Sequence, residues 1–168
     1  MRGRIIITAG LTLALGLSAC GDEQKPALTQ KTLAFTERPT DNFGFADVAP
    51  RTKLGEQGPQ SLSNADTITF SSDLLDASGK DRGDLDIACA VTRPGGFDKS
   101  HLQCNGTATL VGGTLTLSRG GRVFGGASAS GAIVGGSGAY DGATGEFSEG
   151  EESNDRTPYT FHLWLPHD

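Results

Sequence analysis

The chain has 168 residues, a net charge of −6, 25 glycines and three cysteines. An acidic surface repels the phosphates of nucleic acids, so we expect no nucleic-acid partner. The length suits a single domain with a sizeable core.

Residues 1–19 have the pattern of a bacterial secretory signal. Two early arginines precede an uncharged apolar stretch, Ile5 to Leu17, and a lipobox-like Leu-Ser-Ala leads to Cys20. The stretch is too short for an ordinary membrane span. We therefore expect Cys20 to become the lipidated first residue of an exported lipoprotein, anchored at the outer side of a membrane in the cell envelope. The alternative is an accidental apolar start on a cytosolic protein.

The segment after Cys20 is polar, contains a proline and shows no period. We interpret residues 20–30 as a lipidated tether and residues 31–168 as a single β-barrel domain.

Beyond the tether the hydrophobic period is two, and the stretches are short, rich in Thr, Val, Ile, Leu and Phe, and separated by glycine-bearing turns. This pattern predicts an all-β fold. We expect eight strands, at Lys31–Glu37, Thr67–Leu75, Asp84–Thr92, Ser100–Leu110, Thr114–Phe124, Ala127–Val134, Ala143–Ser148 and Tyr159–Leu165.

The connection over residues 38–66 is unusually long for a compact domain and holds three prolines. Such a segment indicates a functional flap or a capping loop. A disordered insertion is the alternative.

Two hairpins have a predictable register. If the turn between the third and fourth strands centres between Gly96 and Phe97, Cys89 pairs with Cys104. Two cysteines facing each other in an exported chain predict a disulfide, with a reactive or metal-binding thiol pair as the alternative. The second hairpin is predicted to turn at Gly112-Gly113, which sets Leu110 against Leu115 and Ala108 against Leu117.

The stretch "GAIVGGSGAYDGATGEF", residues 131–147, is dense in glycine. It lacks the spacing of a dinucleotide-binding loop and the final glycine of a nucleophile elbow. We predict a strand that ends at Val134, followed by a structural glycine corner in which Tyr140 packs back as an anchor. The corner glycines are Gly135, Gly136, Gly138, Gly142 and Gly145.

This corner resembles that of the allene oxide cyclase-like barrels, whose wider relatives include the dirigent proteins. The similarity extends through "FADVAP", "FSSDLLDASGKDRG", "GTLTLSRG" and "YTFHLWL". The resemblance implies an eight-stranded antiparallel, calycin-like barrel with an apolar cavity that accepts a small apolar ligand, often in a homotrimer.

In the plant cyclases a carboxylate and an asparagine on the first strand, and an asparagine on the second, work within the cavity. The corresponding positions here are Ala34 and Thr36, and Ser72, so the carboxylate and both amides are missing. Dirigent proteins use cavity aspartates, which Asp73 or Asp76 could mimic, although solvated turn residues are the alternative. The candidate pocket residues are Thr36, Ser72, Tyr140 and Phe161.

Other chemical candidates are scattered. His101, His162 and His167 have no second ligand at a metal spacing, so we expect no metal and no cofactor. His162 is expected on the barrel exterior, with a general base in the pocket as the alternative. Asp141 and Glu146 could pair as acid and base, but loop carboxylates usually face solvent, and the acidic loop 149–155 is interpreted as solvating rather than as a cation site.

Three functions fit these features. The first is a lipid-anchored barrel that binds a small apolar molecule, and the second is a cyclase or isomerase that acts by pocket confinement. The third is a solid barrel that serves as an envelope structural or interaction module. A cavity would exclude the third, and a buried, otherwise unexplained carboxylate or tyrosine in that cavity would favour the second over the first.

Overall fold

The computed structural model describes residues 27–48, 54–55, 58–59, 61–96, 99–122, 129–151, 153 and 156–166. The predicted signal, Cys20 and most of the tether lie outside these residues. Eight long strands form the domain: β1 (Leu28–Ala46), β5 (Thr67–Leu75), β6 (Asp81–Arg93), β8 (His101–Leu110), β9 (Gly113–Arg122), β10 (Ala129–Gly138), β11 (Thr144–Glu149) and β12 (Thr157–Pro166). The short strands are β2 (Leu54–Gly55), β3 (Gly58–Pro59), β4 (Ser61–Leu62) and β7 (Gly95–Gly96).

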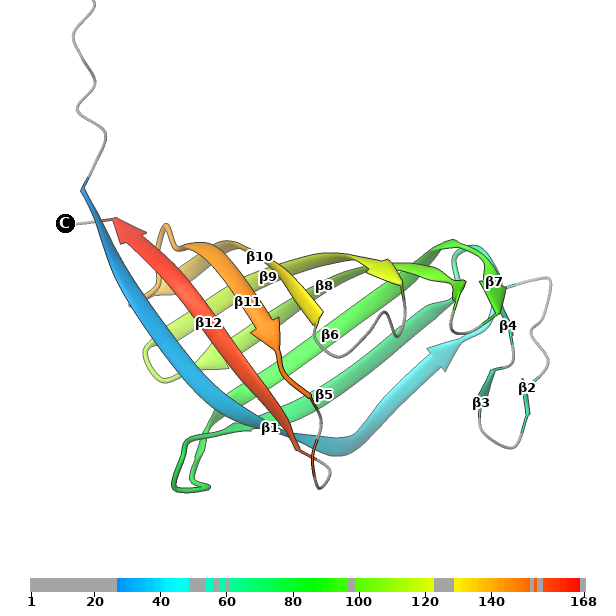
Figure 1. Ribbon diagram of the computed structural model, residues 1–168, viewed down its shortest axis with the longest axis horizontal. Coiled ribbons are helices and arrows are strands. Elements are labelled where there is room, and N and C mark those ends of the chain that lie inside the picture. Colours follow the sequence, from blue (N-terminus) through cyan, green and yellow to red (C-terminus); the bar gives the residue numbers. More distant parts are fainter. Residues whose placement is uncertain are drawn as a thin grey trace, which may run out of the picture.

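The eight long strands close into an antiparallel barrel in the order β1-β12-β11-β10-β9-β8-β6-β5 (Figure 1). The predicted all-β fold with eight strands is confirmed. The first and last strands, β1 and β12, pair with each other over Leu28–Glu37, and this pairing closes the barrel. No helix in the described part of the chain is both long and apolar enough to cross a bilayer.

The first strand is longer than predicted and changes the interpretation of residues 38–66. β1 begins at Leu28, inside the segment assigned to the tether, and continues to Ala46. Its pairing with β5 shifts between Pro39 and Phe43, which marks a bulge. A bulge tolerates a proline because the ladder hydrogen bond that proline cannot donate is already interrupted there. The segment therefore starts as a continuation of the barrel wall rather than as a loop.

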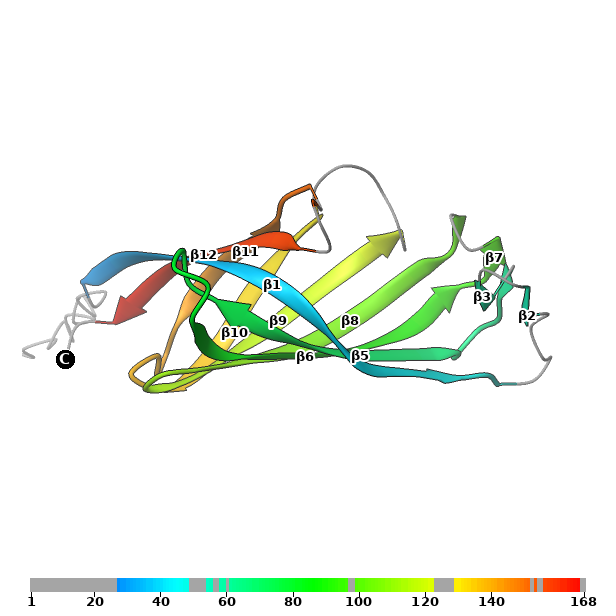
Figure 2. The same cartoon turned by 90° about the horizontal axis from the view of Figure 1, so that it is seen from below.

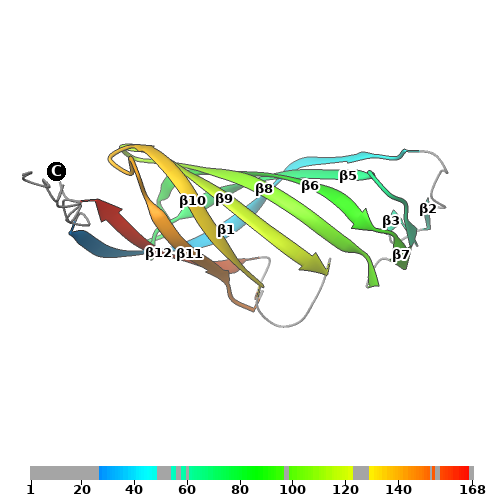
Figure 3. The ribbon, with the colours of Figure 1, turned by 90° about the horizontal axis from the view of Figure 1, so that it is seen from above.

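The later part of that segment reaches the far end of the barrel. β4 pairs with β7, and Leu62 packs on the core there. Figures 2 and 3 show the short strands gathered at the end of the molecule away from the C-terminus, toward which β1, β5, β6 and β8 extend.

One of the two predicted registers is confirmed. β6 and β8 pair Cys89 with Cys104 and Val91 with Leu102, and a disulfide joins the two cysteines. The β8–β9 register is displaced by two residues from the prediction, since Leu110 pairs with Gly113 and Ala108 with Leu115. A side chain at Gly113 would overlap the carbonyl oxygen of Ser137, so this glycine belongs in the strand, and the turn falls on Val111 and Gly112. A two-residue displacement leaves every side chain on its predicted face.

The glycine corner also lies later in the chain than predicted. β10 does not end at Val134 but continues to Gly138, with a register shift between Ile133 and Gly135. A side chain at Gly136 would overlap the carbonyl oxygen of Tyr140, so the strand and the following turn approach too closely for any larger residue. The turn itself contains Gly138 and Gly142 at positive φ.

Two hydrophobic clusters fill the barrel at different levels. The larger contains buried residues from seven of the long strands or their turns: Leu74, Leu85, Ala108, Leu110, Leu115, Leu117, Ile133, Tyr140, Ala143, Phe147, Tyr159, Phe161 and Leu163, with the partly buried Leu33 and Phe35 of β1 packed against them. The smaller lies under β4 and contains Leu62, Ile68, Cys89, Val91 and Leu102. We call the end of the barrel that the larger cluster fills the closed end. The other end, which carries β4 and the smaller cluster, is the open end.

Candidate functional site

A cavity of about 900 Å³ occupies the open end of the barrel. Eight strands leave room inside for side chains or for one small ligand, and this interior is only partly filled. Its lining includes residues of both hydrophobic clusters, such as Phe70, Ile87 and Leu117, together with polar residues between them. A solid barrel is therefore excluded.

The polar residues arise where the inward face of a strand changes character. Successive side chains of a strand alternate between its two faces, so residues two apart share the interior. In five strands the inward residue changes from apolar to polar over one such step toward the open end: Leu74 to Ser72, Phe35 to Glu37, Leu117 to Arg119, Phe147 to Glu149, and Phe161 to the amphipathic Tyr159.

Tyr159 and Glu149 form the most buried polar contact of this group. They pair across β11 and β12, and the Tyr159 hydroxyl donates a hydrogen bond of 2.5 Å to Oε1 of Glu149. Burial, and then the negative charge of Glu149, raise the pKa of Tyr159 well above its usual range. The tyrosine therefore stays protonated, and in this pair it acts as the donor.

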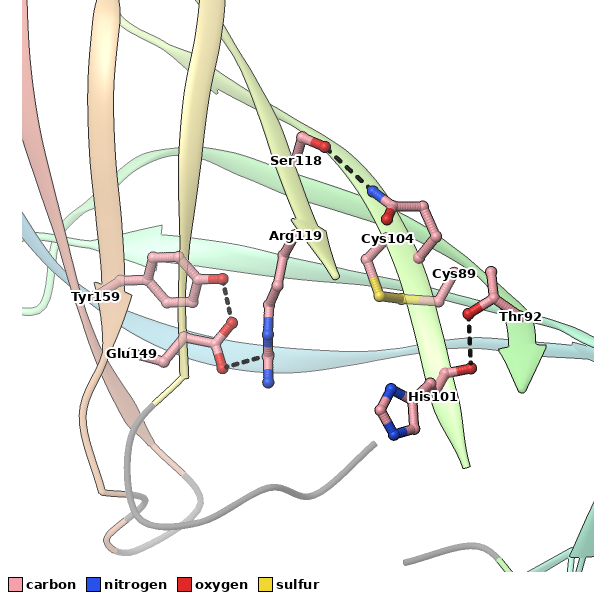
Figure 4. The surroundings of a disulfide bond; sticks show 9 residues. Cys89, Thr92, His101, Cys104, Ser118, Arg119, Glu149 and Tyr159 are labelled. Carbon is pink, nitrogen blue, oxygen red and sulfur yellow. Dashed lines mark hydrogen bonds and ion pairs between the residues drawn. A yellow bond between two sulfur atoms is a disulfide. The ribbon is translucent and has the colours of Figure 1, made fainter. Parts of the chain in front are cut away.

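Arg119 reaches the same carboxylate from β9. Its Nη1 lies 3.6 Å from Oε2 of Glu149, and Figure 4 shows Glu149 between the tyrosine hydroxyl and the guanidinium group. Glu149 therefore has a neutral donor on one oxygen and a cation near the other.

A second carboxylate lies on the other side of Tyr159. Glu37, on β1, accepts a hydrogen bond of 2.5 Å from the hydroxyl of Ser72, which is 2% exposed. The charge of Glu37 also contributes to the raised pKa of Tyr159. The polar groups thus form a continuous arc along β5, β1, β12 and β11.

Another part of the lining, which we call the apolar wall, is formed by nonpolar side chains. β6 and β8 contribute Ile87 and the Cys89–Cys104 disulfide, and β5 contributes Phe70. The cavity therefore has an apolar wall and a polar arc. The side chains of the arc can donate or accept hydrogen bonds and can transfer protons.

The predicted pocket residues separate in the structure. Ser72 lines the cavity, but the other three do not. Thr36 lies between the inward residues Phe35 and Glu37, so it faces outward. Phe161 is fully buried in the closed end, as is Tyr140, whose hydroxyl donates to the carbonyl oxygen of Val111 at 3.4 Å.

The aspartates and histidines considered from sequence lie away from the cavity. Asp73 pairs with Arg38 outside the barrel, and Asp76 sits in the turn after β5. Hydrogen bonds from Ser78 and then Arg82 hold the pKa of Asp76 well below its usual range. His162 is exposed, 3.2 Å from the Thr32 hydroxyl, and His167 lies outside the described residues.

The remaining carboxylates divide between the two faces. Asp141 and Glu146 are exposed and do not line the cavity. Glu149, in contrast, was predicted as part of a solvating loop but is the last residue of β11 and points inward. No group of three or more His, Cys, Asp or Glu side chains that could hold a metal ion occurs in the described ranges.

Sequence reasoning missed Glu37, Arg119, Glu149 and Tyr159. The first-strand carboxylate expected from the plant cyclases was sought at Ala34 and Thr36, one residue out of phase with the inward face that carries Glu37. The available signal was the period of two: each missed residue continues a predicted apolar face by one more step.

No family model and no curated protein sequence matches this chain. Solved structures do match. A pyocyanin demethylase aligns with a TM-score of 0.63 at 22% identity, over 79% of this chain and 99% of its own. A pterocarpan synthase dirigent protein aligns with a TM-score of 0.64 at 16% identity, over 85% of this chain and 94% of its own.

An exo-specific intermolecular Diels–Alderase, AbnU, aligns with a TM-score of 0.59 at 12% identity, over 81% of this chain and 98% of its own. Identities this low establish a shared fold and no more. The chain therefore has the barrel fold found in dirigent proteins and Diels–Alderases, in agreement with the resemblance that its sequence motifs carry.

Proposed function

We propose that this chain is a barrel enzyme that binds a small, mostly apolar organic molecule in its cavity and rearranges it by proton transfer. One observation carries the proposal: the carboxylate of Glu149 lines a cavity with an apolar wall, and it accepts a hydrogen bond from the buried hydroxyl of Tyr159 behind it. A cavity carboxylate that is held by a buried tyrosine favours catalysis over simple binding.

The roles follow from the geometry. Glu149 is the proton acceptor, because its carboxylate lines the cavity and the hydrogen bond from Tyr159 fixes its orientation. Tyr159 remains protonated and is the hydrogen-bond donor that holds Glu149. The apolar wall confines the substrate against these groups, and confinement lowers the barrier of an isomerisation or a cyclisation.

A carrier that binds without chemistry is the second candidate. The apolar wall favours this candidate, because Phe70, Ile87 and the disulfide form a nonpolar surface against which an apolar ligand can pack. For either function we propose export and lipid anchoring at Cys20 to the outer side of a membrane in the cell envelope, on the strength of the leader pattern in residues 1–19. A homotrimer is also proposed, from the sequence resemblance.

The test uses residues 21–168, which retain every described strand, and β-tetralone, a bicyclic ketone with acidic C–H bonds. In D₂O a carboxylate that removes an α-proton leaves an enolate, which then takes up deuterium, so ¹H NMR measures proton transfer directly. We expect the wild-type chain to accelerate exchange and Glu149→Gln to lose about 100-fold of that acceleration.

The matched control is Glu146→Gln, which removes the same charge from the outer face of β11. It should exchange the ketone as fast as the wild type. If the wild type exchanges the ketone no faster than buffer alone, yet still binds a neutral dye such as N-phenylnaphthylamine in the cavity, the carrier remains as the function.

A further inference from the structure

Arg119 lines the cavity although no step of the proposed proton transfer needs a cation there. It lies on the inward face of β9, two residues after the buried Leu117, and its side chain is 24% exposed. Arginine is charged at every physiological pH, so a positive charge is always present in this cavity.

The guanidinium group is only loosely engaged by the protein. Its contact with Glu149 spans 3.6 Å, and no hydrogen bond from its nitrogens occurs within the described part of the chain. A guanidinium carries five N–H donors in a fork that fits an oxyanion. Most of those donors are available to a molecule in the cavity.

The surrounding strands support Arg119 and leave space for such a molecule. Arg119 pairs with Cys104, so the disulfide lies beside it on the inner face (Figure 4). The strand on its other side, β10, contributes only Gly131 and Ala129 between Arg119 and Glu149. Arg119 itself lines the cavity, so the guanidinium is reachable from it.

The charges of the cavity are also divided by position. The end of β9 contributes Arg119 and Arg122, whereas Glu37 and Glu149 lie on β1 and β11. A ligand with an acidic oxygen would therefore be oriented, because its oxygen is drawn to β9 and repelled by the carboxylates.

We propose that Arg119 is a specificity-determining residue that binds an acidic oxygen of the ligand, namely a carboxylate, phenolate or enolate oxygen on a mostly apolar body. The body lies against Phe70, Ile87 and the disulfide. This inference rests on the proposed binding function and narrows the substrate to weak organic acids and enolisable carbonyl compounds.

A pair of fluorescent dyes tests it. N-phenylnaphthylamine is neutral, and anilinonaphthalene sulfonate has the same ring skeleton with one added sulfonate. We expect both to bind the chain in competition with each other. Arg119→Gln should lower the affinity for the sulfonated dye about tenfold or more, as for a lost charge-assisted hydrogen bond, and change the neutral dye by less than about twofold.

Two further variants separate a contact from a general field. Arg119→Lys keeps the charge and should retain part of the preference for the sulfonated dye. Arg93→Gln removes the same charge at an exposed position of β6 that does not line the cavity, and should have an effect of less than about threefold because salt screens it.

The outcomes distinguish the inference from the function beneath it. If neither dye binds, the proposed binding function fails and the inference with it. If the neutral dye binds while Arg119→Gln leaves the sulfonated dye unchanged, only the role of Arg119 is overturned. An equal loss in Arg93→Gln would also overturn it, since net charge rather than a contact would then select the anion.

Discussion

The closed and open ends of the barrel are made by the same strands, yet they differ in what fills them. At the closed end the inward residues are Leu, Ile, Phe and Tyr, and side chains such as Phe161 and Leu85 are completely buried. At the open end the same strands present Ser72, Glu37, Glu149 and Arg119 to a cavity, and the buried Tyr159 lies between the two ends. One end supplies the stability that allows the other to keep polar groups in a partly empty interior.

The largest expected effect is a loss of stability at the closed end. Phe161→Ala removes a fully buried ring and should lower the free energy of unfolding by about 3–5 kcal/mol, measured by urea denaturation. Phe70→Ala, on the cavity wall, should cost less but weaken binding of the neutral dye. Equal destabilisation by the two changes would contradict the distinction between the ends.

The disulfide should be the main covalent support of the open end. It closes a loop with a sequence separation of 15 residues, so Cys89→Ala combined with Cys104→Ala should cost about 3 kcal/mol. Because Cys104 pairs with Arg119, the double variant should also bind the sulfonated dye more weakly. If the double variant is as stable in urea as the wild type, the disulfide does not stabilise the open end.

Two neighbouring glycines test the packing of the closed end. Gly136→Ala should cost about 2 kcal/mol because its new side chain overlaps the backbone of Tyr140. Gly135→Ala is the matched control: its side chain would meet nothing within 4 Å, and its effect should stay within about 0.5 kcal/mol. Thermal unfolding of both variants measures the difference. A loss confined to Gly136→Ala would show that the close approach of Tyr140, rather than backbone flexibility, requires glycine there.

The buried hydroxyl of Tyr159, which lies between the two ends, should make stability depend on alkaline pH. Tyr159 has its pKa raised in the folded chain above the ordinary value of 10.0, so its stabilising contribution is complete below pH 10 and falls as the pH rises further. Above pH 10 the wild type should lose about 1 kcal/mol per pH unit more than Tyr159→Phe. Parallel urea-denaturation profiles for the two proteins would show that this hydroxyl is not held protonated.

The smallest expected effect lies in the turn that precedes β5. Ala65 has a φ of 71°, which costs energy for any residue with a side chain. Ala65→Gly should therefore stabilise the chain by about 0.5 kcal/mol, measured by thermal unfolding. A loss of stability would mean that the alanine methyl group contributes packing at this end.

Most of the fold could be predicted because the signal for it is local. Each of the eight long strands shows a period of two that fixes its two faces, whatever its partners. The disulfide register followed from a single turn between adjacent strands, so Cys89 and Cys104 could be paired correctly. The β8–β9 register was displaced by two residues, because a strand position for Gly113 depends on its close approach to the carbonyl oxygen of Ser137 on a third strand, which the local sequence does not reveal.

The candidate site depends on contacts that join distant strands. Tyr159, Glu149 and Glu37 come together only because β12 lies between β11 and β1 in the closed barrel. Arg119 comes within 3.6 Å of the same carboxylate from β9, although β10 lies between β9 and β11 in the barrel.

The sequence by itself thus determined the strands, their two faces, the disulfide and the kind of barrel they form. The tertiary structure alone decided which polar residues share one level of that barrel and which end of it stays hollow. The physical reason is that alternation along a strand is a property of its own backbone, whereas the depth of each residue in the barrel is set by the stagger of all eight strands.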